Sequence, residues 1–72
     1  MTTVTFLKNE EEGDVFARFY TGSRGMVDVF DGQHATAHID YIAQCKEAEK
    51  SEYKHLKNQL IELDYSLNIT NQ

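Results

Sequence analysis

The sequence predicts an α+β fold in which a three-stranded antiparallel meander is followed by one long C-terminal helix (βββα). Short runs of β-branched and aromatic residues, separated by glycine-containing turns, fill the first half of the chain. Apolar residues recur at helical spacing in the second half. The chain contains no proline, so no residue forces a break in that helix. Its 72 residues are predicted to form a single domain.

The three predicted strands cover residues of about 3–8, 15–21 and 26–30. In the first strand, Val4 and Phe6 share one face. The second strand carries aromatic residues on both faces, which indicates a position in the middle of the sheet. Only a polar turn and the turn 22–25 separate the three strands, so neighbouring strands are expected to pair in antiparallel fashion.

The segment after the third strand has two interpretations. Asp31-Gly32 is a strong two-residue hairpin signal, and it would introduce a fourth short strand at 34–39. The alanine-rich stretch that begins at Ala35 instead continues into a helical pattern without a break. We favour a helix at about 35–67, with Asp31 or Thr36 as its N-cap, and keep the fourth strand as the alternative.

The second half of the predicted helix carries a heptad seam. Apolar residues at alternating steps of three and four form it: Tyr53, Leu56, Leu60, Leu63 and Leu67. A helix of about 33 residues is about 50 Å long, whereas a compact chain of this size has a diameter of roughly 30 Å. The helix is therefore expected to extend beyond its sheet and to use the seam as a partner or dimer interface. The alternative is a helix that folds back near Glu47–Ser51, and Glu49 is expected to mark the change of packing partner.

Few residues in the chain offer chemistry. His34 and His38 have the i, i+4 spacing of two imidazoles that share a metal ion on a helix, which makes them a weak candidate metal site. Cys45 lies about 10 Å from His38 along the expected helix axis, which is too far to complete that site. Cys45 also has no activating neighbour, and no nucleophile elbow or acid/base carboxylate pair is recognisable. We therefore predict that the protein is not an enzyme and uses no metal or other cofactor.

The charge distribution limits the classes of partner. A formal net charge of −5 argues against nonspecific nucleic-acid binding. Four lysines flank the seam and form a candidate anion contact: Lys46, Lys50, Lys54 and Lys57. We interpret these lysines chiefly as a solvated face that bridges to glutamates. The turn 22–25 is interpreted as a plain hairpin, and the sheet aromatics as core side chains, not as a base-stacking platform.

These observations predict a small non-enzymatic protein-binding module or modulator, a homodimer that also binds another protein through its C-terminal helix. Size and character resemble those of phage and mobile-element accessory proteins, including regulators and inhibitors, although no motif carries that analogy. The alternative is a nucleic-acid-binding regulator that uses the helix lysines. One cysteine and the lack of an apolar run of signal-peptide or membrane-spanning length predict a cytoplasmic protein with no membrane partner.

Overall fold

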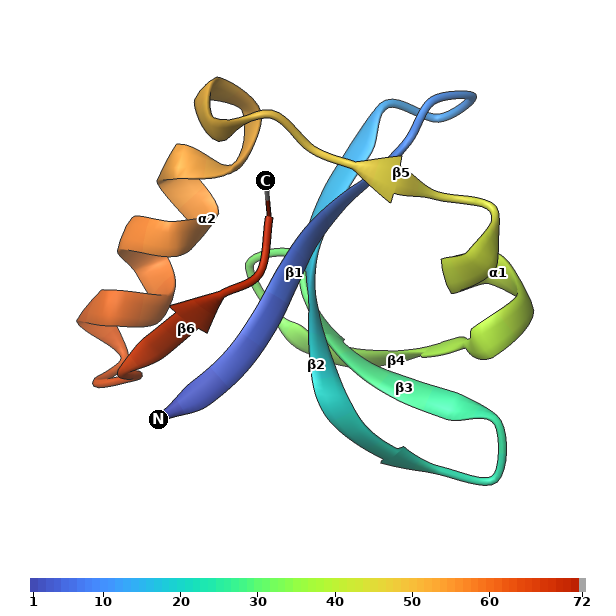
Figure 1. The fold of residues 1–72 in the computed structure, drawn as a ribbon, viewed down its shortest axis with the longest axis horizontal. Helices are drawn as coiled ribbons and strands as arrows, with labels where there is room; N and C mark the ends of the chain where they lie inside the picture. The colour runs from blue at the N-terminus through green and yellow to red at the C-terminus, as the bar shows by residue number, and fades with distance from the viewer. Residues whose placement is uncertain (72) are drawn as a thin grey trace.

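The computed structural model describes residues 1–71. Within them, a six-stranded sheet has the strand order β4-β3-β2-β1-β5, and β6 also pairs with β1 (Figure 1). The strands are β1 (Thr2–Asn9), β2 (Asp14–Ser23), β3 (Met26–Phe30), β4 (His34–His38), β5 (Lys46–Glu47) and β6 (Leu67–Ile69). The helices are α1 (Ile39–Ala43) and α2 (Lys50–Glu62). The β1–β6 pair is parallel, and the other strand pairs are antiparallel.

The predicted fold, a three-stranded meander followed by one long helix, is wrong. The first three strands occupy the ranges expected for them, but the region 35–67 is divided among β4, α1, β5, α2 and β6. The fourth strand, which the sequence offered as an alternative, is present as β4 and pairs with β3 along its full length. The protein is therefore a sheet-dominated fold with two short helices.

Pairing with the sheet interrupts the expected helix. Gly32 adopts a φ of 116°, so the chain reverses there and enters a strand instead of a helix. After α1, β5 pairs with β1, and the Ala48 N–H donates to the Phe6 carbonyl at 2.9 Å. The longest extent of the molecule is 28 Å, well short of the roughly 50 Å that a continuous helix would need. In β4 and β5, hydrogen bonds to β3 and β1 thus replace the bonds that a continuous helix would have formed.

Local capping sets the ends of α2. Glu49 is its N-cap, and the Glu49 N–H donates to Oε1 of Glu52 at 2.9 Å, which is one half of a capping box. At the other end, Asp64 adopts a φ of 68°, and the Tyr65 N–H donates to the Leu60 carbonyl at 3.1 Å. This pattern is a Schellman termination. Glu49, expected to mark a change of packing partner, instead begins the helix.

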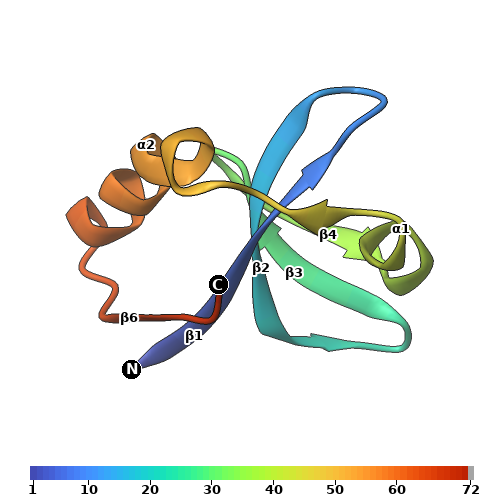
Figure 2. The ribbon, with the colours of Figure 1, turned by 45° about the horizontal axis from the view of Figure 1, so that its top comes forward.

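The two faces of the sheet carry separate hydrophobic clusters, and one helix covers each (Figure 2). The larger cluster packs under α2 and consists of Val4, Phe6, Ala17, Phe19, Phe30, Ala48, Tyr53, Leu56 and Leu60. The smaller cluster packs under α1 and consists of Leu7, Phe16, Val27, Val29 and Ile42. Aromatic side chains on both faces of β2 are accounted for by this arrangement, because β2 lies between the two clusters.

The outer edge of β1 is closed by short segments. β6 pairs with its first half and β5 with its second half. Between them, the Asn71 side chain accepts a hydrogen bond from the Phe6 N–H at 2.6 Å and donates to the Phe6 carbonyl at 2.8 Å. It also donates to the Ala48 carbonyl at 3.1 Å. One side-chain amide therefore occupies the gap between β5 and β6.

In residues 1–71, neither helix has the length and apolar character needed to cross a membrane.

Candidate functional site at the open edge of the sheet

The residues predicted as a helix interface occupy different environments. Tyr53, Leu56 and Leu60 are 7%, 4% and 0% exposed, respectively, and belong to the cluster between α2 and the sheet. Leu63 is 54% exposed at the end of α2, and Leu67 is half-buried in β6. The heptad-like spacing thus describes the inward face of a short amphipathic helix. In this structure the three buried side chains are not available to a partner.

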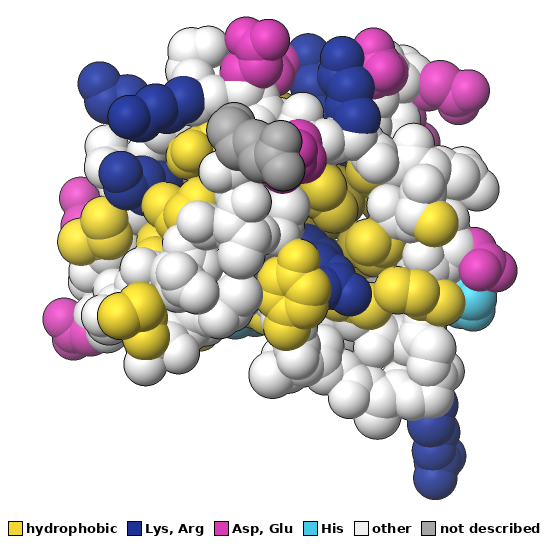
Figure 3. All heavy atoms as spheres, viewed as in Figure 1, with side chains coloured by type: hydrophobic (Ala, Val, Ile, Leu, Met, Phe, Trp, Pro, Cys, Tyr) yellow, Lys and Arg dark blue, Asp and Glu magenta, His cyan; other side chains and the backbone are white. Residues whose placement is uncertain are grey.

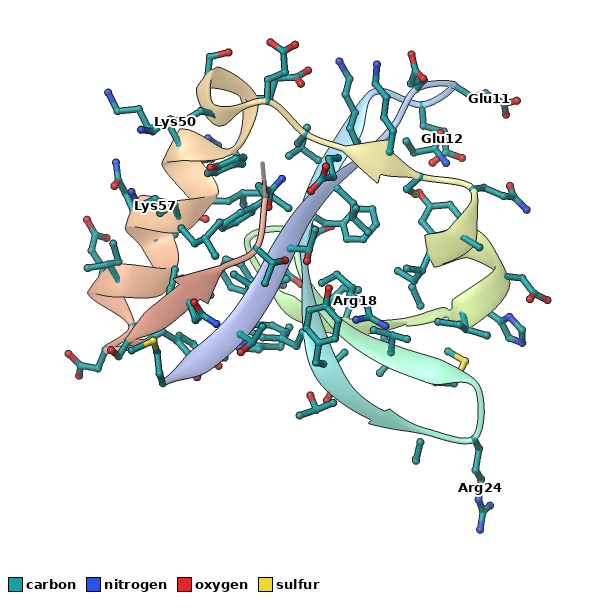
Figure 4. The ribbon with its side chains drawn as sticks, viewed as in Figure 1. Glu11, Glu12, Arg18, Arg24, Lys50 and Lys57 are labelled. Atoms are coloured by element: carbon teal, nitrogen blue, oxygen red, sulfur yellow. The ribbon has the colours of Figure 1, made fainter. Side chains whose placement is uncertain are left out.

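The four candidate lysines lie on two different elements. Lys46 lies on β5 and forms an ion pair with Glu10 at 3.2 Å. Lys50, Lys54 and Lys57 lie on α2, where they line a shallow hollow of about 330 Å³ beside the Tyr53 ring. Figure 4 shows Lys50 and Lys57 on this helix. Only the three helical lysines therefore remain together as a candidate anion contact.

His34 and His38 lie at opposite ends of β4, so four residue steps along the strand, about 13 Å, separate them. His34 Nε2 is 2.8 Å from the Tyr65 hydroxyl, and Nδ1 of His38 accepts from the Asp40 N–H and caps α1. Within residues 1–71, no group of three or more His, Cys, Asp or Glu residues is placed to hold a metal ion. The i, i+4 spacing matched a helix that this segment does not form.

Cys45 is a half-buried thiol, and its Sγ donates to the Tyr41 carbonyl at 3.4 Å. Burial in the surrounding structure raises the pKa of the Cys45 thiol, and the negative charge of Glu12 adds to the effect. A thiol of raised pKa holds little thiolate at neutral pH, so Cys45 is a poor nucleophile.

The turn 22–25 is a two-residue hairpin between β2 and β3. Arg24 and Gly25 have φ values of 56° and 78°, which is the pattern of a type I′ turn. Gly22 is required next to the turn because a Cβ there would lie 2.1 Å from the Met26 carbonyl oxygen. The register of β2 and β3 shifts between Arg18 and Gly22, so β2 bulges at this point.

Tyr20 differs from the other sheet aromatics because its side chain is exposed. Phe6, Phe16 and Phe30 are buried in the two clusters, whereas Tyr20 is 55% exposed. Its hydroxyl lies 2.6 Å from the Thr5 hydroxyl. The hydrogen bond with Thr5 lowers the pKa of Tyr20, and Thr70 and Arg18 add to this shift.

The outer edge of β4 is open in the described part of the chain. β4 pairs only with β3 in the described part of the chain, so its other edge has no strand partner. Four of its five residues are exposed, and the fifth, Ala37, is half-buried. The strand contains no lysine, arginine, carboxylate or proline. Natural edge strands are usually protected by charged residues, prolines or bulges, because an open edge can pair with another chain.

The ladder between β3 and β4 indicates which backbone groups face outward. The Ile39 N–H donates to the Gly25 carbonyl at 2.8 Å, one step beyond the last residue pair of the ladder. Bonded and non-bonded pairs alternate in an antiparallel ladder, so the backbone of Ala37 faces β3 and that of Thr36 faces the free side. An added strand would bond to Thr36 and to the two ends of β4.

A hollow of about 660 Å³ lies over the larger cluster and extends from the start of β1 across β2 to the start of β4. Phe19, His34 and Tyr65 line it, and their rings contact one another: the ring centroids of Phe19 and Tyr65 are 5.7 Å apart, and those of His34 and Tyr65 are 6.0 Å apart. Asp28 also lines this hollow, and its carboxylate accepts from the Thr21 hydroxyl at 2.7 Å.

A second, smaller hollow of about 180 Å³ lies on the other face of the sheet. Phe16 and Tyr41 provide its aromatic lining, and Asp14 and Asp31 provide carboxylates. In the part of the chain that the structure describes, no lysine or arginine lines either hollow. The open edge is therefore flanked on both faces by depressions that combine aromatic rings with negative charge.

Sequence reasoning assigned β4 to a helix and therefore missed this edge. The signal that could have revealed it was Asp31-Gly32, which is a hairpin signal between two strand-like runs.

Comparison with protein-family models, curated proteins and solved structures found no match to this chain.

Proposed function

We propose that the protein is a non-enzymatic protein-binding module that captures an extended segment of another protein by strand addition to β4. The observation that supports this proposal is the contrast between the two sheet edges. β5, β6 and the Asn71 side chain close the edge of β1, whereas β4 leaves outward backbone groups without a strand partner among residues 1–71. Main-chain hydrogen bonds provide affinity in strand addition, and flanking pockets select alternate side chains.

The captured segment carries basic and apolar side chains. Side chains of a strand alternate between the two faces of a sheet, so an added strand would direct them toward the hollows on both sides of β4. Asp28 lines one hollow, and Asp14 and Asp31 line the other. Their carboxylates complement lysine or arginine, and the aromatic rings beside them accept the apolar part of such side chains.

Protein binding is the function expected from the sequence, but the proposed binding surface is the edge of β4 instead of the C-terminal helix. The homodimer stays a prediction, and pairing of β4 between two copies is the route by which it would form. The cytoplasm is the expected compartment, because Cys45 is a free thiol.

The proposal is tested with Thr36→Pro and with two synthetic peptides, one alternating lysine and valine and one alternating glutamate and valine. Proline removes the outward N–H of Thr36 without removing a bond to β3, so the fold should be retained. The basic peptide should protect the amides of β4 from hydrogen exchange in the unmodified protein and in the control Thr36→Ala. Equal binding of the basic peptide by Thr36→Pro, or preference for the acidic peptide, would contradict strand addition to β4.

Self-association is measured in the same samples by sedimentation. A dimer that Thr36→Pro dissociates, together with no peptide binding, would show that β4 serves a second copy instead of a foreign segment.

A nucleic-acid-binding regulator is the second candidate function. Lys50, Lys54 and Lys57 form no ion pair with a carboxylate among residues 1–71, which leaves three cations together on α2. Binding through them would weaken steeply as salt concentration rises. Absence of a mobility shift with single-stranded and duplex probes at low salt would rule this candidate out.

A further inference from the structure

Arg18 is a half-buried cation without a counter-ion. It forms no ion pair with any carboxylate in the described part of the chain, and its Nε is buried without a hydrogen-bond partner. Withdrawal of a charge from water is costly unless a partner of opposite charge or a set of hydrogen bonds compensates for it. The fold therefore maintains a cation that lacks its usual partners.

Arg18 packs against an aromatic ring and has uncharged cross-strand neighbours. Its Cζ lies 3.8 Å from the centroid of the Tyr20 ring, a cation–π contact. Its cross-strand partners are Thr5 on β1 and Val29 on β3. Figure 3 shows a basic side chain in the middle of this face with hydrophobic side chains around it, and Figure 4, drawn from the same side, labels Arg18 at that place.

A shallow hollow opens beside this guanidinium. It measures about 290 Å³ and is lined by Arg18, Tyr20 and the hairpin residues up to Met26. That volume is near the lower end of the range for small-molecule sites in proteins. The type I′ turn and the required Gly22 give the hairpin one defined shape, so the wall of the hollow is preformed.

We propose that Arg18 anchors a binding site for a small organic anion, a carboxylate carried on an aromatic body. One guanidinium matches one carboxylate in charge and in the geometry of its paired N–H donors. Arg24 also lines the hollow, but its side chain extends from the hairpin tip away from Arg18 (Figure 4), so Arg18 is the cation that lies against the Tyr20 ring. The exposed Tyr20 ring and Met26 supply the surface against which the aromatic body packs. This site is separate from the β4 edge and does not depend on the proposed function.

Four ligands test the proposal in titrations followed by amide NMR: benzoate, acetate, benzamide and phenyl phosphate. Benzoate should shift the amides of the β2–β3 hairpin and bind more tightly than the other three, because it alone combines one negative charge with a flat apolar body. Benzamide binding as tightly as benzoate would show that charge is not recognised. Tighter binding of phenyl phosphate, or shifts confined to other parts of the chain, would also overturn the proposal.

Arg18→Gln should weaken benzoate binding at least about tenfold, because it removes a charge-assisted pair. Lys46→Gln, which removes one charge on β5, is the matched control and should change the affinity by less than about twofold. Unchanged affinity in Arg18→Gln would overturn the proposal. If that variant does not fold, Arg18→Lys replaces it: the lysine keeps the charge but lacks the paired donors, so benzoate should again bind more weakly, and unchanged binding would count against the site.

Discussion

Asn71 shows how one side chain can stand in for a segment of strand. Its amide group accepts from and donates to the backbone of Phe6, as a neighbouring peptide group would, and it also reaches the Ala48 carbonyl. Asn71 and Phe6 are 65 positions apart in the chain. Without this amide, the part-buried Phe6 N–H would lie unpaired between β5 and β6.

Asn71→Ala is expected to lower the free energy of unfolding by about 1–3 kcal/mol, because it leaves a part-buried backbone donor unpaired. Urea denaturation measures the change. Asn68→Ala is the control, since the Asn68 side chain is exposed and makes one long contact, 3.4 Å, to the Thr3 hydroxyl. Similar small losses in both variants would show that Asn71 does not seal the edge.

Lys8 and Glu52 join β1 to α2 through an ion pair. The hydrogen bond from Lys8 lowers the pKa of Glu52, and the bond from the Glu49 N–H adds to the shift. A carboxyl group whose folded-state pKa lies below its unfolded value of 4.5 stabilises the fold above that pH. The stabilisation is lost as pH falls through the folded-state pKa.

Glu52→Gln removes the charge but keeps an oxygen that can accept from the Glu49 N–H. The melting temperature of this variant should lie below that of the unmodified protein near neutral pH, and the difference should shrink below about pH 4.5. Thermal melts at a series of pH values measure it. A difference that is constant with pH would show that the ion pair does not account for the effect.

At the scale of elements, the length of α2 decides whether its apolar face is buried against the sheet or exposed. Its 13 residues span about 20 Å, which fits over the sheet, whereas the expected helix would have extended far beyond it. The same apolar spacing is therefore an inward face in the short helix and would have been an exposed seam in the long one. The caps at Glu49 and Asp64 decide between the two cases, because they define where α2 begins and ends.

Leu60→Ala should cost about 2–5 kcal/mol of unfolding free energy, because the Leu60 side chain is fully buried and its loss leaves a cavity. Leu63→Ala, at an exposed position of the same predicted seam, should change it by no more than about 0.5 kcal/mol. Chemical denaturation of both variants compares them. Equal costs would mean that the two leucines are buried alike, which would contradict the observed packing of α2.

At the scale of the whole molecule, the sheet has one closed edge and one open edge. The closed edge is assembled from parts that follow β4 in the chain, namely β5, β6 and Asn71. The open edge is β4 itself, and depressions lined by carboxylates and aromatic rings lie on both of its faces. Protection of one edge and exposure of the other is the asymmetry from which we infer strand addition.

Local pattern was enough to predict the first three strands, the turns between them and the grouping of Tyr53, Leu56 and Leu60 on one face of a helix. Alternation places Val4 and Phe6 on one face, and the glycines mark the turns, because both depend on residues close in sequence. The burial of Tyr53, Leu56 and Leu60 on one face also followed from spacing, although the partner expected for them was different. For the candidate sites, sequence drew attention to His34 and the helical lysines but could not place them relative to other elements.

Tertiary structure decided what became of the region 35–67. No local signal shows that Ala48 bonds to Phe6 or that Asn71 fills the gap beside it, because these contacts join residues far apart in the chain. Such bonds depend on β1 being part of the sheet, and in β5 they outweigh the local helical preference of the chain. Local signals also could not reveal that Arg18 lacks an ion pair or that the edge of β4 is open among residues 1–71. Both features depend on where the other elements lie.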